Sequence, residues 1–177
     1  MAWGRIPEQG MPFNQMMLFP TEFRLATTRD GLRLLAIPIR EIEELQSREY
    51  AWSSLSATDA NQRLHLVPPG PLHVKMKVTL ERDDELTIRY QENALATLQF
   101  GDLDKGEGSV EILIDKSVAE IFIDDGRGYI VKEIPATTNV RGVELEVGRS
   151  GSIFNTLDVY KMSSIWKLYV RNSAPVR

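Results

Sequence analysis

The chain has 177 residues, with 21 Lys and Arg against 25 Asp and Glu, two His and no Cys. This length fits a single domain whose core buries roughly 70% of the unfolded surface. The lack of Cys excludes disulfides and thiolate metal sites, and the net charge of −4 without a basic block argues against nucleic acid as a partner.

No apolar run approaches the ~20 residues that a membrane-spanning helix needs. The first five residues lack the basic and apolar regions of a signal peptide. We therefore expect a soluble protein without a membrane partner, and its compartment stays open. His65 and His73 are too few for a histidine-based metal centre and are expected to face solvent from strands. No metal and no cofactor are predicted.

The first 25 residues differ from the rest of the chain, because Gly and Pro residues typical of loops alternate there with short apolar stretches. We expect a strand at 13–19 and a second extended piece at 21–25, separated by Pro20, which cannot donate to a β-ladder. A turn at 28–31, of sequence Thr-Arg-Asp-Gly, precedes a returning strand at 32–38. This pattern predicts a β-hairpin.

Between residues 39 and 61 the regular alternation is lost. Residues 40–49 have a helix-forming composition, so a short surface helix competes here with an irregular connector. Tyr50 and Trp52 form an aromatic pair that could stack on a sugar ring, although such pairs more often pack onto their own domain. Residues 53–61 are polar and are expected to form a loop.

Strand signals become regular after residue 63. They are clearest at 72–80, where Leu, Val and Met occupy every second position. Similar signals, separated by turn residues, recur along the chain at 64–66, 86–90, 96–100, 110–133, 143–147 and 157–166. About ten short strands without a long amphipathic helix favour an all-β fold with antiparallel pairing. We prefer a two-sheet β-sandwich over a closed barrel.

Residues 110–133 are expected to form three antiparallel strands. If Lys116 and Ser117 form a two-residue turn, Asp115 lies opposite Val118 and one face of the pair is wholly apolar. The other face, which we call the mixed face, carries Glu111, Leu113, Asp115, Val118, Glu120, Phe122 and Asp124. It would suit water or another domain rather than a core. Asp-Gly at 125–126 is a strong turn signal, whereas Lys-Ser is weaker and leaves a longer first turn open.

Three segments carry a resemblance to a known family. Residues 115–126, of sequence Asp-Lys-Ser-Val-Ala-Glu-Ile-Phe-Ile-Asp-Asp-Gly, match the pattern Asp-x-Ser-x-x-Glu-Ile/Val-Phe followed by Asp-Gly. This pattern resembles a signature of the C-terminal β-sandwich of glycoside hydrolase family 32, the invertases, levanases and inulinases. Residues 11–25 resemble the segment that leaves the family's catalytic propeller, and residues 163–166, Ser-Ser-Ile-Trp, resemble the close of its sandwich. The three segments occur in the family's order and together span nearly the whole chain, from residue 11 to residue 166.

The resemblance implies a concanavalin-like or lectin-like jelly-roll sandwich at 26–166. A remnant of the propeller's exit strand would precede it at 1–25, and a tail would follow at 167–177. The resemblance also implies that this chain holds no catalytic residue. In the family, two Asp and one Glu act from the propeller, in the motifs Trp-Met-Asn-Asp-Pro-Asn-Gly, Arg-Asp-Pro and Glu-Cys-Pro. None of these motifs occurs here, and Arg29-Asp30-Gly31 lacks the Pro.

A carboxylate pair within the chain is the remaining route to catalysis. Asp115 and Glu120 would be diagonal neighbours on the mixed face, ~7–8 Å apart, a separation that inverting glycosidases use. Because they would sit on a convex hairpin without a pocket, ordinary surface acids are the better interpretation. We expect the chain alone to be inactive.

The leading hypothesis is therefore a non-catalytic accessory domain that packs against the propeller of a family 32-like enzyme. Side chains that we expect at contacts between domains or subunits are Leu113, Val118, Phe122, Phe13, Met17 and Phe19. A charged residue at position 122 is then predicted to loosen association and to leave the fold intact. The strand expected at 13–19 would lack propeller partners, which predicts a homodimer.

The alternative hypothesis is a carbohydrate-binding module. In that case the chain would bind fructans through exposed aromatic side chains, with Tyr50, Trp52 and Tyr129 as candidates.

Overall fold

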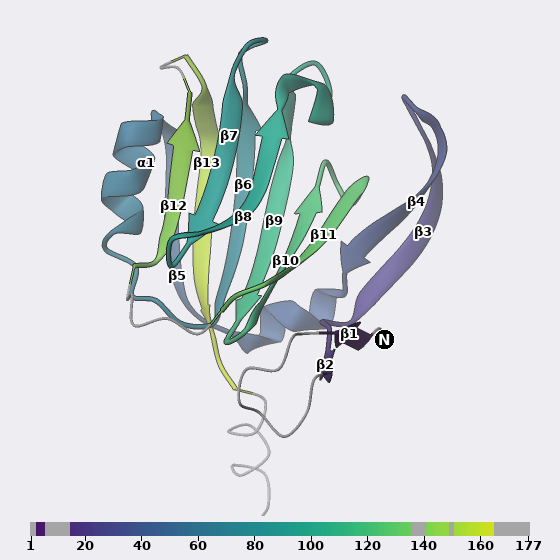
Figure 1. Ribbon diagram of the computed structural model, residues 1–177, viewed down its shortest axis with the longest axis vertical. Helices are drawn as coiled ribbons and strands as arrows, with labels where there is room; N and C mark the ends of the chain where they lie inside the picture. Colours follow the sequence, from purple (N-terminus) through teal and green to yellow (C-terminus); the bar gives the residue numbers. More distant parts are fainter. Residues whose placement is uncertain (1–2, 6–14, 136–140, 149–150, 165–177) are drawn as a thin grey trace, which may run out of the picture.

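The computed structural model describes residues 3–5, 15–135, 141–148 and 151–164, and the structural statements below refer to these residues. Thirteen strands and one α-helix follow one another along the described chain (Figure 1). The elements are β1 (Trp3–Arg5), β2 (Gln15–Met17), β3 (Thr21–Thr28), β4 (Gly31–Pro38), β5 (Gln46–Leu55), α1 (Ala57–Leu64), β6 (Leu72–Thr79), β7 (Glu85–Tyr90), β8 (Asn93–Gln99), β9 (Glu107–Asp115), β10 (Val118–Ile123), β11 (Gly128–Glu133), β12 (Val143–Val147) and β13 (Ile153–Met162). Short 3-10 helices span Arg40–Leu45 and Phe100–Asp102.

Nine of these strands form two antiparallel sheets that pack face to face (Figure 1). One sheet has six strands in the order β11-β10-β9-β6-β13-β5, and the other has three in the order β12-β7-β8. The main core lies between them, and its largest fully buried side chains include Phe154, Leu72, Met76, Leu86, Ile88, Leu98 and Ile112. The chain is thus an all-β antiparallel sandwich, as its sequence predicts.

The pairing of β9 with β10 has the register expected from the sequence. Asp115 lies opposite Val118, and Lys116 and Ser117 form the two-residue turn between them. The wholly apolar face of this pair is buried in the main core through Val110, Ile112, Ile114, Ala119, Ile121 and Ile123. The Asp-Gly turn is also present, with positive φ from residue 124 to 126. Alternation therefore predicts correctly which side chains of these strands face the main core.

Strands β3 and β4 form the hairpin expected between residues 21 and 38, as a two-stranded sheet of their own. In Figure 1 it stands beside the sandwich, at the side of β10 and β11. Strand β3 runs through residue 25, so the hairpin continues across the boundary expected there. Its base is closed by the bond from Ile39 N to Pro20 O, and Ala36 N donates to Gly126 O of the sandwich.

Helix α1 is an unexpected element. It follows β5 after Ser56, and the two elements take the place of the loop predicted at 53–61. The strand signal at 64–66 falls on the last residue of α1 and the turn after it. The hydroxyl of Ser56 caps the helix by accepting a hydrogen bond from Asp59 N at 3.2 Å. Ala60 and Leu64 are buried in the main core. An eight-residue helix gains most of its stability from such packing. The periodicity of so short a sequence is therefore a weak indication of a helix.

Of residues 40–49, for which the sequence leaves a surface helix or an irregular connector open, 40–45 form the 3-10 helix noted above and 46–49 begin strand β5 instead. Neither this segment nor any other helix of the described ranges is long and apolar enough to cross a membrane.

The histidines also differ from expectation. His65 is exposed but follows α1 rather than lying on a strand. His73, on β6, is only 1% exposed. Its Nδ1 lies 3.2 Å from Gln46 Nε2 and its Nε2 lies 2.6 Å from Glu111 Oε1. Because the amide nitrogen donates to Nδ1, Nε2 carries the proton and donates to the carboxylate, so a neutral imidazole is fully satisfied here.

Candidate functional site

The mixed face belongs to the side of the six-stranded sheet that points away from the main core, which we call the outer face. Part of the outer face is covered by the chain's own residues 19–42, and a second, smaller core forms there. Its buried members are Ala36, Ile42, Leu113 and Phe122, with Phe19, Ile39, Tyr129 and Met162 partly buried around them.

Three of the side chains expected at an interface are buried within the chain. Leu113, Val118 and Phe122 are 0%, 3% and 2% exposed, because the chain itself buries them. They present no surface to a second domain or subunit. A charged residue at position 122 would therefore disrupt packing rather than loosen association alone. Met17 is exposed and Phe19 is half-buried against the second core, whereas Phe13 lies outside the described residues.

Glu120 connects the N-terminal segment to the second core. Its side chain is fully buried, and its two carboxylate oxygens accept hydrogen bonds from Phe19 N, at 2.7 Å, and from the Tyr129 hydroxyl. Burial raises the pKa of Glu120, and the two hydrogen bonds oppose that rise. Burial and the neighbouring carboxylate raise the pKa of Tyr129 as well. Glu120 is thus inaccessible to a substrate, while Asp115 stays exposed at its turn.

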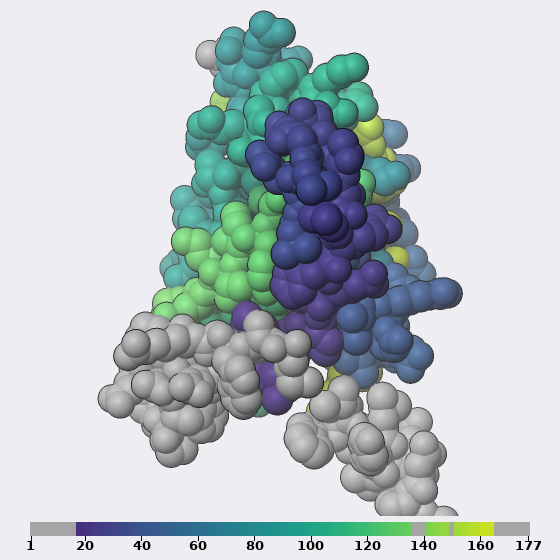
Figure 2. Space-filling model, turned by 90° about the vertical axis from the view of Figure 1, so that its right-hand side faces the viewer, coloured from purple at the N-terminus to yellow at the C-terminus, as the bar shows by residue number. Residues whose placement is uncertain are grey.

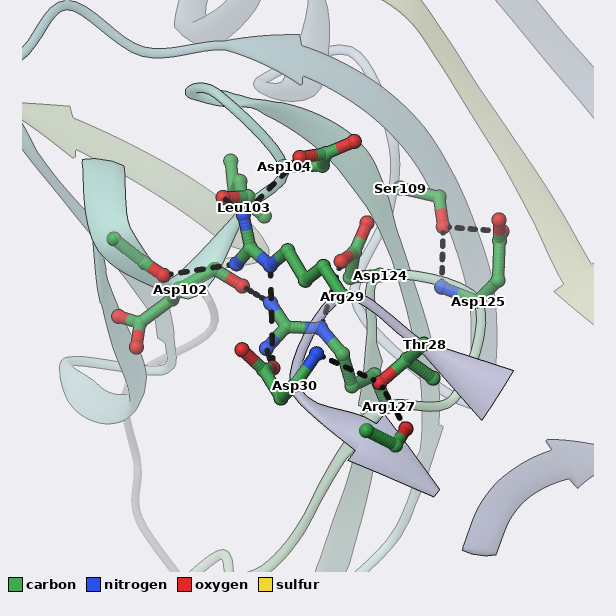
Figure 3. Close-up of polar contacts among 12 residues, drawn as sticks. Thr28, Arg29, Asp30, Asp102, Leu103, Asp104, Ser109, Asp124, Asp125 and Arg127 are labelled. Carbon is green, nitrogen blue, oxygen red and sulfur yellow. Dashed lines mark hydrogen bonds and ion pairs between the residues drawn. The ribbon is translucent and has the colours of Figure 1, made fainter. Parts of the chain in front are cut away.

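The tip of the β3–β4 hairpin is fastened to two loops of the sandwich (Figure 3). Arg29 donates to the carbonyl oxygens of Leu103, at 2.5 Å, and Gly101, at 3.0 Å. Arg127 pairs with Asp30 of the tip at 2.7 Å. Figure 3 shows the two guanidinium groups side by side between the hairpin and these loops. Arg29 and Asp30 therefore attach the tip of the hairpin.

Gly126 allows the middle of the hairpin to approach the sandwich. Its φ is +87°, and a Cβ built on it would lie 2.2 Å from the carbonyl oxygen of Ala36. Any other residue would meet both backbone strain and this contact. The hairpin is thus held at its base, middle and tip.

A cleft of about 560 Å³ remains between strand β4 and the uncovered part of the outer face. Strands β9, β6 and β13 supply its floor in two rows of cross-strand neighbours. The first row is Glu111, Lys75 and Asp158, and the second is Ser109, Lys77 and Thr156. Arg24 of β3, residues 36–38 of β4 and Asp125 complete the lining.

Some groups in the cleft are engaged within the chain. Lys75 Nζ lies 2.6 Å from Glu43 Oε1 and 4.0 Å from Glu111 Oε1. Burial raises the pKa of Asp158, with Glu49 adding to this rise and Lys75 opposing it. In the described ranges, no hydrogen bond involves the side chains of Lys77, Thr156 or Asp158.

The three aromatic candidates for sugar binding are not placed as an exposed platform. Tyr50 and Trp52 are partly buried and pack against the main core, with ring centroids 5.8 Å apart. Tyr129 stacks on Phe122 at 4.9 Å, in addition to its bond with Glu120. Tyr50 and Trp52 thus pack onto their own domain, which is the more common arrangement for such aromatic pairs.

An exposed apolar surface lies on the hairpin, which Figure 2 shows in purple across this side of the molecule. By register, Leu25 lies opposite Leu34, and Phe23 and Leu32 share their face. These four side chains, which we call the hairpin patch, are 56–63% exposed. The alternation at 23–25 and 32–34 is visible in the sequence and could have identified this patch. Arg24, on the opposite face of β3, lines the cleft instead.

Comparisons with known proteins extend this picture. No family model matches the chain. Among curated proteins, it is similar to the levanase of Bacillus subtilis (strain 168), with 19% identity over 191 residues. This match covers 88% of the chain but only 28% of the levanase.

Solved structures of longer enzymes share the fold. The exo-inulinase of Aspergillus awamori matches 88% of the chain with a TM-score of 0.64 and 13% identity. The chain therefore shares the fold of part of this enzyme. The GH32 β-fructofuranosidase of Bombyx mori matches 85% of it, with a TM-score of 0.56 and 16% identity. The chain spans 37% and 34% of these two enzymes, about a third of their length. The resemblance indicated by residues 115–126 is thus confirmed for the fold.

Proposed function

We propose that this module is a non-catalytic accessory β-sandwich of a family 32-type glycosidase that hydrolyses fructans or sucrose. The observation that carries the proposal is the match of nearly the whole module to about a third of such enzymes. A glycosidase needs a nucleophile or base and an acid on the two sides of the scissile bond. The family's motifs for these groups do not occur in the sequence.

The placement of Glu120 supports an inactive module. This carboxylate is fully buried and accepts two hydrogen bonds from the chain itself. It is therefore unable to act with Asp115 on a glycosidic bond. The direct test is to incubate the purified chain with levan, inulin and sucrose and to assay released reducing sugar. We expect no hydrolysis, and a turnover that purification does not remove would refute the proposal.

We infer that the partner of the module is the catalytic propeller, and that the hairpin patch is its docking surface. Four large apolar side chains on one face of a two-stranded sheet are unusual for a surface in contact with water. The enzymes that the module resembles are about three times longer, so a neighbouring domain in the same polypeptide could cover the patch. Residues 11–25, which resemble the propeller's exit segment, lead directly into this hairpin.

A chimera tests this docking. We would join the levanase portion that precedes its matching region to this chain and compare Phe23→Asp with Leu66→Asp. Leu66 is 64% exposed and lies outside the hairpin, which makes it a matched control. Phe23→Asp should lower the melting temperature of the chimera and leave that of the isolated chain unchanged. Equal effects of the two substitutions on the chimera would argue against the patch as docking surface.

A further inference from the structure

The cleft beside strand β4 has the size and the walls of a binding site. Its volume of about 560 Å³ falls within the range of small-molecule sites. The hairpin that forms one wall is anchored through Phe19, Ala36 and Arg29, so the cleft is formed before any ligand arrives. Ala36, Ile37 and Pro38 give this wall an apolar strip.

The floor alternates donors with acceptors. In the first row, Lys75 lies between Glu111 and Asp158, and in the second, Lys77 lies between Ser109 and Thr156. Directly opposed residues of neighbouring strands have Cβ atoms ~4.5–5.5 Å apart, so each lysine stands between two side chains that carry acceptor oxygens, of which Ser109 Oγ is bonded to Asp125. A sugar hydroxyl both donates and accepts, and it needs partners of both kinds.

The charge of the cleft favours an uncharged ligand. Three cationic side chains, Arg24, Lys75 and Lys77, face three carboxylates, those of Glu111, Asp125 and Asp158. The charges of these lining side chains balance, and Glu43, which pairs with Lys75 at 2.6 Å, adds one further carboxylate beside the cleft, so a phosphate group would gain no net attraction. The side chains of Lys77, Thr156 and Asp158 make no hydrogen bond within the described ranges, so they can bond a ligand.

We propose that this cleft binds a neutral oligosaccharide, with Lys77, Thr156 and Asp158 bonding its hydroxyls and the β4 strip contacting its apolar faces. The choice of a fructan as that oligosaccharide rests on the proposed function. The site differs from the aromatic platform expected from the sequence, because Tyr50, Trp52 and Tyr129 are committed to packing. Sugar binding would thus depend on polar side chains of two adjacent strands, β6 and β13.

The experiment is calorimetric titration of the chain with short inulin and levan oligosaccharides. The variants are Lys77→Met and Asp158→Asn, and the control is Lys132→Met, an exposed lysine on β11 outside the cleft. Each cleft variant should weaken binding about tenfold, because it removes a hydrogen bond to a charged group. The control should bind as the wild type does. A melting curve of each variant separates lost binding from lost folding.

Three results would overturn the proposal. They are the absence of binding to both oligosaccharides, an affinity that neither cleft variant changes, and a preference for a phosphorylated sugar over its neutral counterpart. Failure here leaves the accessory role standing, since that role is tested by hydrolysis and by the chimera. Conversely, hydrolysis by the chain alone would refute the accessory role and still leave binding at the cleft measurable.

Discussion

Replacement of Gly126 by Ala should detach the β3–β4 hairpin from the sandwich. The added methyl group would lie 2.2 Å from the carbonyl oxygen of Ala36. This oxygen is a backbone atom, so no change of side-chain rotamer can relieve the contact. Strand β4 must therefore withdraw. The chain offers a matched control in Gly31, whose φ of +88° equals that of Gly126 within a degree but whose surroundings are open within 4 Å.

The two substitutions share one cost and differ in another. Placing an L-residue at such a φ costs roughly 1–2 kcal/mol at either position. At Gly126 the withdrawal of β4 also breaks the bond from Ala36 N to Gly126 O, worth about 0.5–1.5 kcal/mol, and loosens the second core. We expect Gly31→Ala to lower the unfolding free energy by about 1–2 kcal/mol and Gly126→Ala by about 2–4 kcal/mol.

Urea unfolding of the wild type and both variants measures these differences. Amide hydrogen exchange at Ala36 then reports the attachment directly, because this amide is protected only while it bonds Gly126. Gly126→Ala should accelerate that exchange, and Gly31→Ala should leave it unchanged. Equal losses of stability in the two variants, with Ala36 still protected in both, would refute the reasoning.

Three further predictions follow from the second core and its surroundings. Phe122→Ala should cost about 3–5 kcal/mol in urea unfolding, whereas Phe23→Ala, at a side chain 56% exposed, should stay within about 0.5 kcal/mol of wild type. The pKa of Glu120 in the folded chain is raised above its ordinary value of 4.5. The unfolding free energy of the wild type, relative to that of Glu120→Gln, should therefore be greatest below pH 4.5 and fall as the pH rises through the folded pKa. A difference between the two proteins that does not change with pH would contradict this. Removal of residues 1–20 should reduce any dimeric fraction in sedimentation, and an unchanged fraction counts against a dimer through 13–19.

Alternation along the chain predicts the main core well, because the side-chain period of a strand is two and one face must be apolar. It places Ile112 and Ile121 in the core and pairs them correctly. The same pattern says nothing about what lies against the opposite face. There the sequence analysis assigns Phe122 to an interface, whereas a segment of the same chain covers it. The bond from Phe19 N to Glu120 spans 101 residues, beyond the reach of any local pattern.

His73 and helix α1 also show that local sequence patterns do not predict tertiary packing. Alternation puts His73 on the correct face, but the burial of that face by Gln46 and Glu111 depends on tertiary packing. Helix α1 has a recognisable start, in which Ser56 precedes Asp59 by three residues. Its composition is mostly polar, so the sequence favours a loop. The cleft combines strands that are distant in the sequence, and no motif could have indicated it.

The family-like signature at 115–126 has a physical explanation in this structure. Glu120 accepts the amide of Phe19, Phe122 packs into the second core against Ala36, and Gly126 leaves room for the backbone of β4. Each of these residues holds the segment that leads into the sandwich, and none of them lines an exposed catalytic centre. In an enzyme of this kind, such anchors would fix the angle at which the preceding domain meets the sandwich. On the proposed function, the signature would then set the geometry between the domains, and the buried carboxylate of Glu120 would serve that geometry rather than catalysis.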